Sequence, residues 1–70
     1  MIEFTISKGD YIELMQLLKA VKLAYSGGEA KMMIEDELVK LNGQIELRKR
    51  AKIRNGDIVE VMEQKIIVKS

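Results

Sequence analysis

The fold of this chain is decided by Ser26–Val61, which reads SGGEAKMMIEDELVKLNGQIELRKRAKIRNGDIVEV. The stretch opens with a serine and two glycines, and it contains the turn sequences Asn42-Gly43 and Asn55-Gly56. Between Lys40 and Arg54 it carries six basic residues and one acid, Glu46, although the whole chain has a net charge of only +1. Local potential, more than total charge, attracts a polyanion, so this window predicts a nucleic-acid surface.

Ser26 begins the helix that this stretch predicts. Glu29 follows three positions later, at the Ser-x-x-Glu spacing of a capping box. The apolar residues after it recur with helical spacing, namely Ala30, Met33, Ile34 and Leu38. Gly27 and Gly28 lower the helix propensity of the first turn. They either make a tight connection between two helices or let another backbone approach the N–H groups of the helix end.

Upstream of this stretch, the pattern predicts a strand and a first helix. Residues 2–6 alternate between apolar and polar side chains, as in a half-buried strand. Asp10 is a suitable N-cap, and Glu13 stands three positions later, as in a capping box. The inward stripe of the expected helix is Tyr11, Leu14, Leu18, Val21 and Tyr25.

Two hairpins are predicted after the second helix. Around Asn42-Gly43, a two-residue turn would pair Leu41 with Gln44 and mix apolar with polar side chains. A three-residue loop would pair Val39 with Ile45 and keep the faces separate, so we expect the second register. Residues 58–62 and 65–68 predict the other hairpin, with Val59 opposite Val68 and Val61 opposite Ile66.

The expected fold is α+β in a single domain of residues 1–70, in the order β-α-α-β-β-β-β. Two helices would cover one face of a small, mostly antiparallel sheet. The residues expected to point inward are Phe4, Ile6, Leu14, Leu18, Val21, Ala30, Met33, Ile34, Val39, Ile45, Ile53, Val59 and Val61.

Composition excludes several kinds of chemistry. The chain has no cysteine and no histidine, which removes disulfides, thiol nucleophiles and metal sites built on sulfur or imidazole. We therefore expect no cofactor, no metal and no catalytic residue. No apolar run approaches the roughly 20 residues of a membrane span, so no membrane partner is expected. A disulfide-free chain fits the cytoplasm, and we expect a monomer.

The motifs resemble a known RNA-binding family. The pattern that carries the resemblance consists of Ser26, Ala30, Ile34, Val39, Asn42-Gly43, Gly56-Asp57 and Val59. It is similar to the αL-motif RNA-binding domain of small-subunit ribosomal protein S-four, over residues 26–61. The Gly-Gly-x-Ala-Lys opening and the Arg-Lys-Arg-x-Lys-Ile run resemble its stand-alone YbcJ/YaaA-like branch. Members of that branch are small RNA-binding-type proteins without an attached catalytic domain.

Two positions depart from the family pattern. The arginine that usually follows the capping serine is Gly27 here, which removes one expected phosphate contact. Lys31, one turn further into the helix, is the candidate to replace it. The glycine that usually precedes the first hairpin strand is Glu37, which predicts an acid near the RNA face.

These observations predict a non-catalytic protein that docks on structured RNA, ribosomal or transfer RNA, through a basic surface. Arg48, Arg50, Lys52 and Arg54 alternate, which would place them on one side of an extended segment. The expected RNA contacts are Ser26, Gly27, Gly28, Lys31, Lys40, Arg48, Lys49, Arg50, Lys52 and Arg54. The alternatives are an adaptor that binds an acidic protein through the same face and, far behind, an enzyme using the Glu35–Glu37 acidic cluster.

Overall fold

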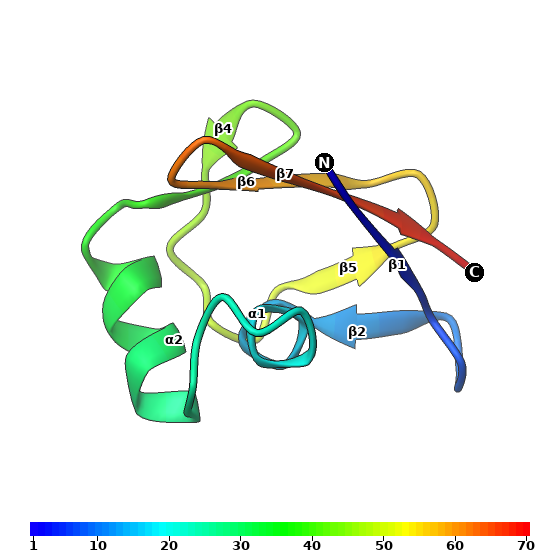
Figure 1. Ribbon diagram of the computed structural model, residues 1–70, viewed down its shortest axis with the longest axis horizontal. Coiled ribbons are helices and arrows are strands. Elements are labelled where there is room, and N and C mark those ends of the chain that lie inside the picture. The colour runs from blue at the N-terminus through cyan, green and yellow to red at the C-terminus, as the bar shows by residue number, and fades with distance from the viewer.

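Two β-sheets and two helices make up the protein in a computed structural model that describes residues 1–70 (Figure 1). The elements are β1 (Ile2–Thr5), β2 (Tyr11–Glu13), α1 (Leu14–Ala20), α2 (Gly27–Glu35), β3 (Val39–Leu41), β4 (Gln44–Ile45), β5 (Lys52–Arg54), β6 (Ile58–Val61) and β7 (Gln64–Lys69). The predicted α+β class is confirmed, and β2 and β5 are two short strands beyond the predicted order. Neither helix has the length and apolar character that a membrane span needs.

The larger sheet has five strands in the order β1-β7-β6-β3-β4. Strands β1 and β7 pair in parallel, and the other neighbours are antiparallel. The smaller sheet is the antiparallel pair β2-β5. Figure 1 shows the larger sheet nearly edge-on across the top, with α1, α2 and the smaller sheet beneath it. The core therefore lies between the larger sheet and the layer formed by the helices and the smaller sheet.

Fifteen hydrophobic residues are buried, and no polar residue is. Ten of the thirteen expected core residues are among them. Phe4 and Val21 are only partly buried, and Ile45 was wrongly assigned because it is 48% exposed on the edge strand β4. The buried residues outside that expected set are Leu17, Ala24, Ala51, Ile66 and Val68.

The first helix is shorter than predicted at both ends: its expected first turn is a strand, and it ends at Ala20, so Tyr25 is exposed instead of facing inward. Tyr11 pairs with Arg54, and Ile12 pairs with the fully buried Ile53. Tyrosine and isoleucine favour strands, and a partner strand across the fold decides the conformation here. Asp10 is therefore not the N-cap. Glu13 occupies that position, and its side chain makes no capping hydrogen bond.

The first hairpin adopts the register that the sequence argument rejected. Leu41 pairs with Gln44, and the two turn residues Asn42 and Gly43 have φ values of 50° and 88°. Such positive values fit a type I′ turn, which matches the twist of the flanking strands. Strand β4 has only two residues, both exposed, so burial does not oppose this choice of the turn.

The second hairpin is shifted by two residues from the prediction. Val59 pairs with Ile66, Val61 pairs with Gln64, and the turn falls at Met62-Glu63. Because a shift of two keeps every side chain on its expected face, Val59, Val61, Ile66 and Val68 still point into the core. Pairing of β7 with β1 on its other side fixes the position, although Met62 and Glu63 are poor residues for positive φ.

Both helices end in the same way, with a non-glycine residue in the left-handed region. At the end of α2, Glu37 has φ of 62° and donates its N–H to the Ile34 carbonyl, and Leu38 donates to Met33. This is the hydrogen-bond pattern of a Schellman motif. Lys22 has φ of 65° at the end of α1. Glu37 also lies at the opposite end of α2 from Ser26, so the acid does not border that helix start.

Replacing Glu37 by glycine is expected to stabilise the protein. A glycine adopts positive φ without the steric cost that a Cβ brings, which is about 1 kcal/mol at such a position, and its own greater chain entropy offsets part of this. Urea denaturation of Glu37→Gly should therefore show a higher midpoint than the native protein. Glu35→Gly, at the last residue of the same helix, should shift the midpoint downward. A lower midpoint for Glu37→Gly would contradict this account of the helix end.

Candidate nucleic-acid interface

The basic segment, Arg48–Arg54, is attached to the start of α1 through its own backbone. The N–H of Leu14 donates to the Ala51 carbonyl at 2.9 Å, and the N–H of Met15 donates to the Lys49 carbonyl at 3.0 Å. The first N–H groups of a helix have no partner within the helix, so these two carbonyls supply them. Ala51 is 4% exposed and is the buried anchor of the segment. The side chains of Arg48, Lys49 and Arg50 remain exposed around it.

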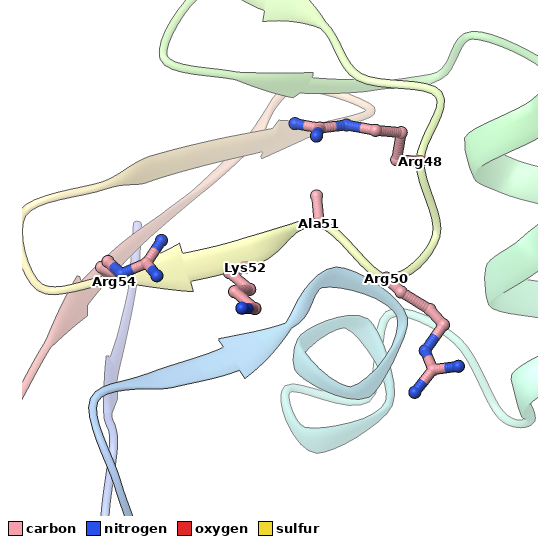
Figure 2. A pocket seen from close by; sticks show the side chains of 5 residues that line it. All are labelled: Arg48, Arg50, Ala51, Lys52 and Arg54. Carbon is pink, nitrogen blue, oxygen red and sulfur yellow. The ribbon is translucent and has the colours of Figure 1, made fainter.

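The first half of the basic segment is a turn, and only the second half is a strand. The Ala51 N–H donates to the Arg48 carbonyl at 3.1 Å, which closes the turn, and β5 begins at Lys52. The prediction that alternation puts all four cations on one side of an extended chain is therefore wrong in its geometry. Figure 2 shows Arg48 and Arg50 leaving the turn in opposite directions, while Lys52 and Arg54 follow along β5.

The four cations nevertheless border one shallow depression. It has a volume of about 400 Å³ and is lined by Arg48, Arg50, Ala51, Lys52 and Arg54 (Figure 2). Guanidinium and ammonium groups are the side chains that contact phosphate oxygens in nucleic-acid complexes. We call this feature the cationic depression.

Two carboxylates contact the arginines of the cationic depression. Glu46 accepts from Nε of Arg48 at 3.1 Å and from Nη2 at 3.2 Å, and Glu13 accepts from Nε of Arg50 at 3.2 Å. The hydrogen bond from the Arg48 side chain lowers the pKa of Glu46, and the same contact raises the pKa of Arg48. Glu46 therefore stays ionised into a more acidic range than a free glutamate. Both arginines are mostly exposed, at 78% and 74%, which leaves them accessible to a further anion.

Lys52 and Arg54 share the outer face of the smaller sheet with Tyr11. The Lys52 Nζ lies 5.1 Å from the centroid of the Tyr11 ring, and the Arg54 Cζ lies 5.8 Å from it. Both distances are within the range of cation–π attraction. On the other face of the pair, Ile12 and Ile53 point toward the core. The sheet register thus holds an aromatic ring against the two cations.

The start of α2 was correctly predicted from the sequence. The Ser26 hydroxyl accepts from the Glu29 N–H at 3.1 Å, and the Glu29 carboxylate accepts from the N–H of Tyr25 at 2.8 Å. Gly27 packs closely on α1, since a Cβ there would lie 3.1 Å from the Met15 methyl. Met15 also donates its N–H to Lys49. One residue of α1 therefore contacts both the start of α2 and the basic segment.

Three other predicted contacts do not line the cationic depression. Lys31 lies on α2 with its ammonium 4.0 Å from the Glu35 carboxylate. Lys40 is exposed in β3 between the inward-facing Val39 and Leu41, so it lies on the face of the larger sheet away from the core. Lys49 is exposed in the turn beside the depression. The ten predicted residues are thus spread over several places in the fold.

Two residues of the sequence motif have structural contacts. Asn42 donates from Nδ2 to Oδ1 of Asp57 at 3.0 Å, and its Oδ1 accepts from the Ile58 N–H at 2.9 Å. The second oxygen of Asp57 accepts from the Arg54 N–H at 2.8 Å. The two side chains connect the β3–β4 turn to the turn that follows β5. They hold the end of the basic segment in place.

Replacing Ser26 by alanine is expected to lower stability by roughly 0.5–2 kcal/mol, because the Glu29 N–H loses its acceptor. Arg50→Ala is the comparison, since exposed ion pairs contribute little to folding. Denaturant melts of the two variants measure the difference. Equal losses would mean that Arg50 has a structural role.

The chain matches one protein family over nearly its whole length. Residues 4–69 match the family model described as the S4 domain. The match spans nearly the whole chain, so the chain belongs to the S4-domain family.

The chain is similar to YbcJ proteins of that family. "Putative RNA-binding protein YbcJ" of Escherichia coli (strain K12) is 41% identical over 59 residues, which cover 84% of each chain. "Uncharacterized protein YbcJ" of Shigella flexneri matches with the same identity and coverage. The solution structure of Escherichia coli YbcJ, described as having an αL motif involved in RNA binding, matches with a TM-score of 0.77 and 36% identity. That match covers 100% of this chain and 89% of the YbcJ chain, and it confirms the resemblance to the αL-motif domain.

Sequence reasoning missed three residues of the site. Tyr11 and Glu13 were assigned to a helix, and Glu46 was counted only as a charge. The available signal was the strand-forming triplet Tyr11–Glu13, whose alternation complements that of Lys52–Arg54.

Proposed function

We propose that this protein is a non-catalytic RNA-binding protein that docks on structured RNA through the cationic depression. Arg48, Arg50, Lys52 and Arg54 are its principal phosphate contacts. Lys49, Lys31 and the start of α2 at Ser26–Gly28 extend the contact surface. Ribosomal or transfer RNA is the expected partner, because both present folded phosphate backbones.

The observation that carries this proposal is the anchoring of the basic segment on α1. The carbonyls of Lys49 and Ala51 point into the helix start, so the exposed side chains between and beyond them are held outward. A preorganised set of cations loses less conformational entropy on binding than the same residues in a flexible loop. The relatives named for RNA binding and the family match support the same function.

The experiment is a salt titration of RNA affinity. If four or five cations contact phosphates, a plot of log K against log salt concentration should have a slope of about −3 to −4.5. A folded stem-loop RNA, an unstructured single strand and a DNA duplex of matched length should be compared. We expect the tightest binding to the folded RNA, since a surface that contacts phosphates and sugars responds to backbone shape.

Two results would contradict the proposal. A slope near zero for every nucleic acid would favour the adaptor that binds an acidic protein. Equal affinity for DNA and RNA would retain phosphate binding but remove the preference for RNA.

A further inference from the structure

A small crevice opens next to Tyr11, outside the surface described so far. It has a volume of about 170 Å³ and lies between the end of β1 and the start of β2. Its lining is mostly apolar, with Ser7 and Lys8 as the polar members; the apolar residues are Phe4, Ile6, Tyr11 and Ile12. Phe4 and Ile12 are partly buried, which fixes the walls of the crevice against the core.

Tyr11 connects this crevice to the cationic depression. Its ring contacts Lys52 and Arg54, which line the depression, and the same ring lines the crevice, whose lining includes neither cation. Tyr11 therefore borders the crevice and also lies against two of the cations proposed to hold phosphates. Tyr11 is 40% exposed, so part of the ring remains accessible.

We propose that the crevice beside Tyr11 receives an unpaired base of the bound RNA, which stacks on the tyrosine ring. The proposal rests on the RNA-binding function proposed above. An RNA strand held at Lys52 and Arg54 carries its bases next to its phosphates, and a base has the flat apolar face that an aromatic wall accepts. Lys8 at the polar side of the crevice is available to the phosphate of the same nucleotide.

A neighbouring hollow fits this role less well. It is lined by residues 8–13 and Gln16, and it also borders Tyr11. Two of its lining residues, Asp10 and Glu13, are acids that repel a phosphate backbone. No acid lines the crevice between β1 and β2, so it does not repel the phosphate that accompanies the base.

The test compares a stem-loop RNA carrying 2-aminopurine in its loop with a blunt duplex of the same stem. The native protein should bind the stem-loop more tightly and quench the 2-aminopurine fluorescence. Tyr11→Leu should lose about tenfold in affinity for the stem-loop, because stacking on an aromatic ring contributes strongly per base. Its affinity for the blunt duplex should fall much less, because the duplex offers no unpaired base to the ring. Tyr11→Phe keeps the ring and should behave as the native protein.

Several outcomes would overturn the inference. Equal losses on both RNAs would mean that Tyr11 acts only by holding Lys52 and Arg54 in place. An unchanged affinity of Tyr11→Leu, with its circular dichroism spectrum intact, would mean that no base stacks there. Absence of binding by the native protein to either RNA would overturn the proposed function itself. The first two results leave that function standing.

Discussion

Changing Arg48 and Arg50 together to glutamate should weaken binding to a structured RNA by at least about 40-fold at about 0.1 M salt. Each phosphate contact contributes about 0.8 to the slope, so the loss of two contacts removes about 1.6. Over the tenfold range from 1 M to about 0.1 M salt, that loss corresponds to about 40-fold in affinity. The slope of log K against log salt should also flatten by about 1.4–1.8. Different RNAs should be weakened to a similar degree, because phosphate contacts carry no base information. Fluorescence anisotropy over a salt series measures both quantities.

The two carboxylates of the site provide the control with the opposite sign. Glu13→Gln together with Glu46→Gln removes the acids that contact Arg50 and Arg48. RNA binding should become tighter, because the two arginines no longer lose a contact with a carboxylate when they bind a phosphate. Thermal melts of both double variants check that the fold persists. Weakening by the glutamine pair would mean that the two ion pairs position the arginines for RNA.

Replacing Ile53 by alanine should cost about 2–5 kcal/mol of folding stability. Ile53 is fully buried in β5, where it pairs with Ile12 and lies between Lys52 and Arg54. The loss combines the transfer free energy of the removed atoms with the cavity left behind. For a domain of this size, 1 kcal/mol corresponds to about 4–8 °C, so the melting temperature should fall by about 10 °C or more.

The matched control is Ile45→Ala, the same substitution at a residue that is 48% exposed. It should change stability by less than about 1 kcal/mol. The sequence pattern placed both isoleucines in the core, whereas the structure buries only Ile53. The two variants therefore test which description of the core is correct. A large loss for Ile45→Ala would mean that β4 is packed more tightly than its exposure indicates.

Features set by near neighbours were predictable from the sequence. The cap at Ser26 depends on Glu29, three residues away, and it was correctly placed. The α+β class followed from the periodicity of each segment. The family motif added the expectation of RNA binding, which the names of the YbcJ relatives share.

Features set by distant partners were not predictable. Tyr11 and Ile12 continue a helical pattern, and only their pairing with Arg54 and Ile53 makes them a strand. The turn at Arg48–Ala51 depends on carbonyls that meet the start of α1. The alternation along the basic segment therefore picked out the four cations that line the cationic depression, but it predicted the wrong backbone path.

The parallel pairing of β1 with β7 has a consequence for the order of folding. It joins Ile2 to Ile66 and Thr5 to Lys69, so nearly the whole chain separates the paired residues. Closing so long a loop is entropically costly, and contacts of this kind form late and slow the folding of a domain. The hairpin of β6 and β7 closes over only two turn residues and is expected to form first. During synthesis, β1 therefore has no partner strand until β7, the last strand, has been made.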